Sequence, residues 1–147
     1  MSGLADPRAL LGRWRLERVV EDRRAGEHHE IEGTLEIVEA GAELRWEESL
    51  VWHRHDGDVE ARRGLRLARV DGDWWVRFED GRDFHPWAPG ETVVHPCAPD
   101  TYTGAVEGTP LRWTVRWTAQ GPEKDYEMTS VLTPEASPGA APGASPG

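Results

Sequence analysis

The chain has 147 residues, a formal net charge of -10 and a single cysteine, Cys97. This length suits one domain with its own core, the acidic charge argues against nucleic-acid binding, and one cysteine excludes an internal disulfide. No apolar run approaches the roughly 20 residues of a membrane span. Because the first residues also lack the basic and apolar regions of a signal peptide, we expect a cytoplasmic protein without a membrane segment.

The first predicted element is a short helix that starts near Asp6, because Asp6 suits the N-cap and Pro7 the first helical position. After it, alternating apolar and polar residues between turn residues predict about ten β-strands. These strands cover residues 12–20, 28–38, 42–55, 59–70, 74–79, 82–87, 92–97, 100–106, 111–119 and 124–132. Residues 134–147 are rich in Pro, Gly, Ala and Ser, which predicts a disordered tail after a single domain of residues 1–133.

Three Asp-Gly pairs, at residues 56–57, 71–72 and 80–81, separate consecutive predicted strands. Asp-Gly is a strong hairpin signal, because a type I′ turn needs positive φ at both central residues. Short turns throughout predict an antiparallel meander, which either closes into an up-and-down barrel or leaves two exposed edges. We predict closure: an all-β, antiparallel up-and-down barrel with the short N-terminal helix over one end.

The turn positions also predict which side chains face the interior, since side chains alternate across a strand. The hairpin closed by residues 80–81 should place Val76 opposite His85 and Phe78 opposite Asp83. The predicted interior contains six tryptophans and seven polar side chains. These are Trp46, Trp52, Trp74, Trp87, Trp113, Trp117, Glu48, Arg63, Asp83, His85, Asp100, Tyr102 and Tyr126.

Two parts of this register bear on the candidate site. Glu48 should lie opposite Gly33 on the preceding strand and opposite Leu65 on the next. For the strand over residues 92–97 the turns allow two arrangements. Either His95 and Cys97 face outward, or a bulge near the prolines turns them inward.

The chain resembles the calycins, the lipocalin-like barrels, at Gly12-x-Trp14 after the short helix. More widely, residues 10–132 resemble an uncharacterised bacterial lipocalin-like family known only as a domain of unknown function. The stretches that carry this resemblance are Gly12-Arg13-Trp14 and residues 22–26, 80–85, 95–102 and 121–126. The family often has proline where this chain has Asp83. The resemblance implies a barrel fold and no established activity.

His85 beside an inward Asp83 is the candidate for catalysis, with Tyr102 and Tyr126 as groups that could polarise a carbonyl. A carboxylate orients a neighbouring imidazole and raises its pKa, which suits a general base. The alternative is a core histidine that is simply hydrogen-bonded inside the barrel.

The other polar candidates also have two interpretations each. Glu48 and Arg63 form either an internal ion pair or a clamp for a polar ligand group. Lys124 is either a rim residue that binds an anionic group or a plain surface lysine. His95 and Cys97 could form a thiolate–imidazole pair, or Cys97 is a small buried thiol.

Four further histidines could suggest a metal site. His53 and His55 should point outward close to a turn, and zinc usually needs three or four convergent protein ligands, so we predict a solvated surface and no metal site. The four histidines are His28, His29, His53 and His55.

We therefore predict a binding protein for a small hydrophobic or aromatic molecule, with no cofactor. The ligand would stack on tryptophans and be oriented by a few polar groups. The predicted ligand-binding residues are Trp46, Glu48, Trp52, Arg63, Trp74, Trp87, His95, Asp100, Trp117 and Lys124. One alternative is a cofactor-independent cyclase, isomerase or hydratase of a specialised metabolite that uses the catalytic candidates above. Another is a haem-binding barrel with His85 or His95 as axial ligand. Calycin barrels host all three functions.

Overall fold

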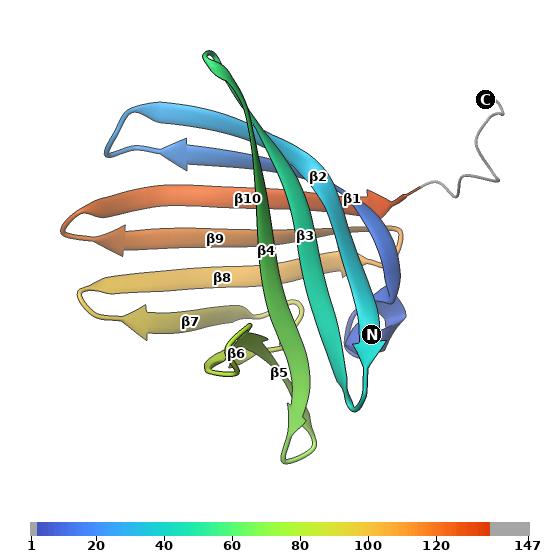
Figure 1. The fold of residues 1–147 in the computed structure, drawn as a ribbon. Helices are drawn as coiled ribbons and strands as arrows, with labels where there is room; N and C mark the ends of the chain where they lie inside the picture. Colours follow the sequence, from blue (N-terminus) through green and yellow to red (C-terminus); the bar gives the residue numbers. More distant parts are fainter. Residues whose placement is uncertain (1–2, 136–147) are drawn as a thin grey trace, which may run out of the picture.

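The computed structural model describes residues 3–135 and shows ten antiparallel strands around a nearly closed barrel (Figure 1). The strands are β1 (Gly12–Asp22), β2 (Glu27–Ala40), β3 (Glu43–Arg54), β4 (Gly57–Val70), β5 (Asp73–Phe78), β6 (Asp83–Pro86), β7 (Thr92–Cys97), β8 (Asp100–Thr109), β9 (Arg112–Gly121) and β10 (Lys124–Pro134). Their order in the sheet is β6-β5-β4-β3-β2-β1-β10-β9-β8-β7. The predicted all-β, up-and-down fold is confirmed.

Strands β6 and β7 are the two edges of the sheet, and within the part of the chain that the structure describes no hydrogen-bonded ladder joins them. Side chains bridge the gap between these two edges. The Phe84 ring of β6 lies edge-on to the His95 ring of β7, with centroids 5.1 Å apart, and Phe78 lies 5.7 Å from the same imidazole. Each edge strand also contains a proline, Pro86 or Pro96, which has no N–H to donate to a ladder. Aromatic contacts thus replace backbone hydrogen bonds at this seam.

The predicted N-terminal helix is a single 3-10 turn, η1 (Pro7–Leu10). Its N-cap is as predicted, since the Asp6 carboxylate accepts a hydrogen bond from the Arg8 backbone N–H at 2.9 Å. The turn ends there because Leu11 is already extended and β1 begins at Gly12.

This N-terminal segment covers one end of the barrel. Leu4 and Leu10 are fully buried. Two indole N–H groups bind their carbonyls: Trp14 Nε1 donates to Leu10 and Trp87 Nε1 to Leu4, each at 2.8 Å. Fixed donors on the first strand and just after β6 therefore hold the segment in place.

Tryptophan rings fill the interior next to this covered end. Trp113 is fully buried, and Trp14 and Trp46 meet it edge-on at centroid distances of 5.5 and 5.6 Å. Edge-to-face packing is a favoured arrangement of aromatic rings. This half of the barrel is a packed core.

Two predicted registers are wrong by two residues, but the predicted inward face is retained. Glu48 lies opposite Leu35 and Arg63, not opposite Gly33 and Leu65. The loops of the two hairpins are residues 41–42 and 55–56, whereas the predicted register places the turns at residues 40–41 and 56–57. Moving a turn by one residue moves the register by two, which leaves every side chain on its original face.

The turn at residues 71–72 is as predicted. Asp71 and Gly72 both have positive φ, 53° and 88°, and Val70 pairs with Asp73. A two-residue turn at this position predicts Leu65 opposite Phe78, and this pairing is confirmed.

The hairpin at residues 80–81 differs from the prediction. The Phe78 N–H donates to the Arg82 carbonyl at 2.8 Å, so three residues form the loop, and Gly81 has positive φ whereas Asp80 does not. Val76 still faces His85, but the register shifts between Val76 and Arg77, so that Arg77 lies opposite Asp83. This odd displacement turns Asp83 to the outside of the barrel.

Strand β10 continues to Pro134, and the Glu135 N–H donates to the Arg13 carbonyl at 3.1 Å, so the sheet extends past the predicted domain boundary at residue 133. The rest of the predicted tail, residues 136–147, lies outside the described residues. Residues 3–135 contain no apolar helix long enough to cross a membrane.

Gly33 provides a test of the close approach of β2 and β3. A Cβ at this position would lie 1.9 Å from the Ser49 carbonyl oxygen, a backbone atom of the neighbouring strand. We expect Gly33→Ala to lower the free energy of unfolding by about 1–3 kcal/mol or more. Urea unfolding measures this, with Glu39→Ala, an exposed residue near the end of β2, as a control that should change it by less than about 0.5 kcal/mol. Equal stability of both variants would contradict the packing described.

Candidate ligand-binding site

The barrel contains a small inner cavity that joins a larger pocket at its open end. The inner cavity has a volume of about 20 Å³, which is room for roughly one water molecule. The mouth pocket has about 400 Å³, within the size range of small-molecule sites. Strand β1 leads away from η1 to Asp22, which pairs with Tyr126 of the pocket lining, so the mouth is at the end opposite η1. Both hollows are lined by Arg63, Phe84, Trp117 and Met128.

Three stacked aromatic rings form one wall of the mouth pocket. Phe84 stacks between Phe78 and Trp117, with centroid distances of 4.5 and 4.9 Å and interplanar angles of 17° and 14°. Gly104 makes room for this stack, because a Cβ there would lie 2.6 Å from the Trp117 ring. The wall offers flat apolar surface to a planar ligand.

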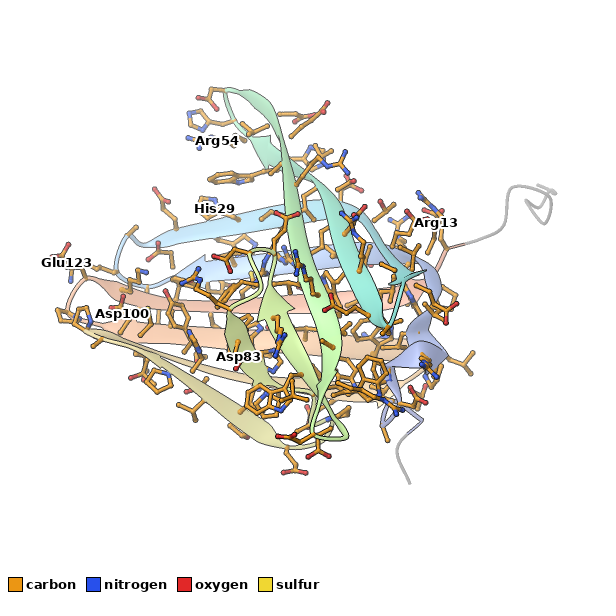
Figure 2. All side chains as sticks on the ribbon, turned by 60° about the horizontal axis from the view of Figure 1, so that its bottom comes forward. Arg13, His29, Arg54, Asp83, Asp100 and Glu123 are labelled. Atoms are coloured by element: carbon orange, nitrogen blue, oxygen red, sulfur yellow. The ribbon has the colours of Figure 1, made fainter. Side chains whose placement is uncertain are left out.

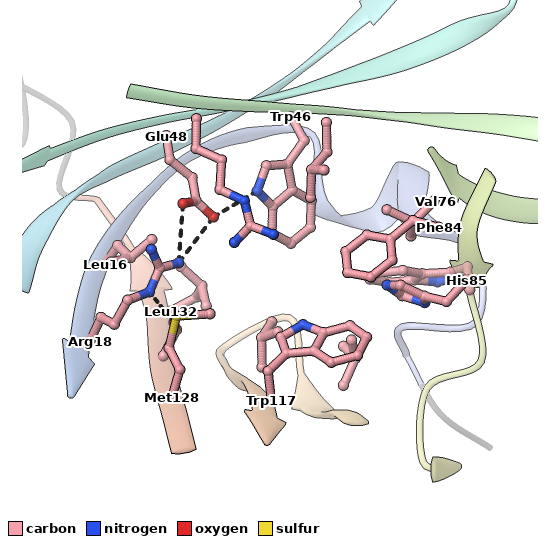
Figure 3. Close-up of a pocket in the computed structure, with 16 residues that line it drawn as sticks. Leu16, Arg18, Trp46, Glu48, Val76, Phe84, His85, Trp117, Met128 and Leu132 are labelled. Carbon is pink, nitrogen blue, oxygen red and sulfur yellow. Dashed lines mark hydrogen bonds and ion pairs between the residues drawn. The ribbon is translucent and has the colours of Figure 1, made fainter. Parts of the chain in front are cut away.

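A buried ion pair lies at the inner cavity, where Arg18 from β1 faces Glu48 from β3 (Figure 3). Nη2 of Arg18 lies 3.1 Å from both carboxylate oxygens, and its Nε donates to the Ser130 hydroxyl at 2.7 Å. Oε2 of Glu48 also accepts a hydrogen bond from Trp46 Nε1 at 2.9 Å. These two charges therefore compensate each other and are hydrogen-bonded, as buried charges must be.

Arg63 has no such compensation, although it lies directly opposite Glu48 in the β3–β4 register. The side chain is half-buried, lines both hollows, and makes no hydrogen bond or ion pair with any residue in 3–135. Burial lowers the pKa of Arg63; Glu48 opposes this effect and the positive charge of Arg18 adds to it. A cation without a partner thus lies where the mouth pocket meets the inner cavity.

His85 is a neutral histidine in this environment. Its Nδ1 lies 2.8 Å from the Pro86 carbonyl, so Nδ1–H donates there and Nε2 keeps its lone pair. Burial lowers the pKa of His85 to about 4, against the effect of the Pro86 hydrogen bond and with a further contribution from His95 and Arg63. At neutral pH this side chain is an acceptor, not a cation.

The rim of the mouth carries a lysine and two tyrosines. Lys124 Nζ donates to the Tyr102 hydroxyl at 2.7 Å and lies 3.3 Å from an Asp100 carboxylate oxygen, and these contacts raise the pKa of Lys124. Burial raises the pKa of Tyr126, so this phenol stays protonated and can donate a hydrogen bond.

The structure brings most of the predicted site residues together. The inner cavity is lined by Trp46, Glu48, Arg63, His85, Trp87 and Trp117, and the mouth pocket by His95, Tyr102 and Tyr126 as well as Arg63 and Trp117. Asp100 and Lys124 are paired at the rim. Of the two arrangements open for β7, His95 faces the pocket, and Cys97 lies at the pocket edge with an exposed side chain.

Asp83, predicted beside His85 in the interior, is exposed on the outer face. Its carboxylate accepts a hydrogen bond from Arg77 Nε at 2.9 Å. The predicted Asp83–His85 pair does not form, because the bulge in the β5–β6 hairpin displaces the register by one residue.

Trp52 and Trp74 also lie away from both hollows. Trp52 is on the part of the β3–β4 hairpin beyond the barrel, edge-on to His29 and under the Arg54 guanidinium, at 4.7 and 4.6 Å, and Figure 2 labels both of these neighbours. Trp74 packs beneath two guanidinium groups, those of Arg8 and Arg69, at 5.7 and 5.1 Å from the ring centroid. Both tryptophans are on the predicted inward face of their strands. They nevertheless lie away from the cavity, because the strands are longer than the hollow.

Three of the four histidines that were predicted to lie at a solvated surface contact carboxylates: His28, His29 and His53. His28 contacts Glu21 and Glu30, and these hydrogen bonds raise its pKa. His53 contacts Glu32 and Asp58 with the same effect on its pKa. Within the described part of the chain, no three His, Cys, Asp or Glu residues are grouped as a metal site requires.

Among the lining residues that were not predicted, three contribute directly to the site: Arg18, Phe84 and Ser130. The alternation that buries Trp14 and Leu16 also places Arg18 inside, so a signal was present for it. No sequence pattern indicated Phe84 as a lining residue, because it is next to His85 in sequence. Only the irregular course of β6 lets both side chains line the cavity.

By its fold, this protein is an up-and-down β-barrel that is covered at one end and open at the other. Its interior combines a packed tryptophan core with a partly polar cavity. The chain belongs to the family of unknown function DUF6314, whose family model matches residues 10–134. No curated protein matches the chain in sequence.

Because the Arg18–Glu48 ion pair is buried, we expect the protein to lose stability when one of its two members is replaced. Arg18→Met leaves the Glu48 carboxylate buried without its cation, which should lower the free energy of unfolding by about 3–5 kcal/mol. The double variant Arg18→Met/Glu48→Leu removes both charges and should recover most of this loss. Chemical denaturation of the four proteins of the cycle measures the coupling. If the two single substitutions add, the pair contributes nothing.

Because the pKa of His85 is lowered by folding, we expect the stability of the protein to depend on pH. Its folded-state pKa of about 4 lies below the unfolded value of 6.5, so between these values the unfolded chain binds the additional proton. Stability should therefore fall as pH falls from 6.5 to 4, by about 3 kcal/mol from this group. The raised pKa values of His28 and His53 act in the opposite direction, since their contribution is present below pH 6.5 and lost as pH rises.

Comparing wild type with His85→Leu isolates the buried group, because both proteins share the surface histidines. Urea unfolding at several pH values between 4 and 8 should show a flatter acid limb for His85→Leu. Parallel pH profiles would mean that His85 titrates normally.

Proposed function

We propose that this protein is a lipocalin-like binding barrel that holds a small aromatic or apolar molecule in its mouth pocket. The observation that supports this is the stacked wall of Phe78, Phe84 and Trp117 beside a hollow of about 400 Å³. Apolar pockets of this size with a few polar groups are typical of small-molecule sites. The packed tryptophans at the covered end act as the rigid base of the pocket.

The polar groups around the mouth would orient the ligand. Arg63 and Tyr126 offer donors at the lining, and His85 Nε2 offers an acceptor at the inner cavity. Because the inner cavity has room for about one water molecule, the body of the ligand would occupy the mouth.

Acid–base catalysis has less support than binding. Asp83 lies outside the barrel, and a histidine whose pKa is about 4 is a weak base at neutral pH. For haem, His95 has the space of the mouth pocket beside it, whereas His85 adjoins the small inner cavity.

Titration with N-phenyl-1-naphthylamine, a neutral aromatic probe, tests the proposal. We expect saturable binding, with quenching of tryptophan fluorescence because Trp117 lines the pocket. Phe84→Ala should weaken binding by about tenfold, since aromatic contacts contribute about 0.5–1.5 kcal/mol beyond area burial.

Val94→Ala is the matched control, because Val94 is on β7 next to His95 but is 55% exposed on the outer face. It should bind the probe as wild type does. Absence of saturable binding in wild type, or equal loss in both variants, would contradict the proposed function.

A further inference from the structure

The charged side chains of the cavity leave one positive charge in excess. Arg18 and Glu48 compensate each other at 3.1 Å, His85 is neutral, and Arg63 has no counter-charge in hydrogen-bond contact within residues 3–135. A half-buried cation in an aromatic lining is costly unless an anion reaches it. The cavity is therefore complementary to a ligand with one negative charge.

The other cations at the mouth are already paired. Lys124 lies 3.3 Å from Asp100, and Arg82 Nε lies 2.8 Å from Asp80. In the described part of the chain, Arg63 is thus the one cation lining the two hollows that is available to a ligand.

We propose that Arg63 anchors the carboxylate of an aromatic or apolar monocarboxylic acid whose body lies on Phe84 and Trp117. This inference rests on the proposed function and specifies its ligand class. A guanidinium presents a planar fork that matches a carboxylate, and charge-assisted hydrogen bonds of this kind are roughly twice as strong as neutral ones. A phosphate monoester fits less well, because it carries about -1.5 to -2 charges at neutral pH against one uncompensated cation.

The lining also determines the direction in which the acid binds. Arg63 lies between the two hollows, so the carboxylate would point inward and the apolar body outward, against the stacked rings. Tyr126 lines the same pocket and is protonated, so its hydroxyl can donate a second hydrogen bond to the carboxylate. The lone pair on His85 Nε2 would repel an anion that moved deeper.

The net negative charge of the protein makes a preference for an acid over a neutral analogue informative. With a net charge of -10, the protein does not attract anions in general. Tighter binding of an acid than of its neutral analogue would therefore identify a local cationic anchor.

Isothermal titration with 2-naphthoate and 2-naphthamide, which share one ring system and differ in charge, tests the inference. Wild type should bind the acid at least tenfold more tightly than the amide. Arg63→Met should reduce the affinity for the acid to that for the amide and leave the amide unchanged, whereas Arg63→Lys should retain part of the preference.

Arg77→Met is the matched control, because it removes a cation of β5 that Asp83 already pairs on the outer face, away from both hollows, and it should keep the preference within about twofold. Thermal melts check folding, and Arg63→Gln replaces Arg63→Met if the latter does not fold. Equal affinity of wild type for acid and amide, or an unchanged preference in the Arg63 variants, overturns the carboxylate anchor and leaves the proposed function intact. Loss of all binding, including that of the neutral naphthylamine probe, overturns both.

Discussion

The interior of this barrel depends on the ion pair between Arg18 and Glu48. It links β1 to β3, and the Ser130 hydroxyl extends the contact to β10, so three strands are tied from within. Both charges are almost completely buried, and a buried charge is tolerated only with a partner. The pair therefore determines how the strands that carry it approach one another, and it leaves Arg63 as the uncompensated charge.

Aromatic side chains are present at both ends of the barrel, but they pack differently at each end. At the covered end, Trp14, Trp46 and Trp113 meet edge to face and exclude space. At the open end, Phe84 and Trp117 stack face to face and leave a pocket beside them. The seam between β6 and β7 belongs to this second group, because aromatic contacts there take the place of a hydrogen-bonded ladder. The least regular part of the sheet is thus next to the candidate site, as is common for irregular strands in barrels.

The period of two along a strand explains which predictions succeeded. At Glu48, an error of one residue in each flanking turn displaced the register by two and kept the side chain inside. At Asp83, a three-residue loop displaced the register by one and moved the side chain outside, because only odd displacements exchange the faces. An Asp-Gly pair predicts a turn, but the pair at residues 71–72 and the pair at 80–81 adopt different loops, and local sequence does not distinguish them.

By itself, the sequence determined the strands, their antiparallel order and most inward faces, because alternation and turn residues act over a few positions. The alternation along β1 also carried a signal for Arg18 on the buried face, although Arg18 was not among the predicted site residues. Only the tertiary structure decided which inward side chains meet: Trp113 fills space, Trp52 lies beyond the barrel, and Phe84 lines the pocket. It alone paired Glu48 with Arg18 across the barrel rather than with Arg63 on the adjacent strand. The reason is physical, since distances across a closed sheet depend on the position of every strand at once, whereas a face depends on one strand alone.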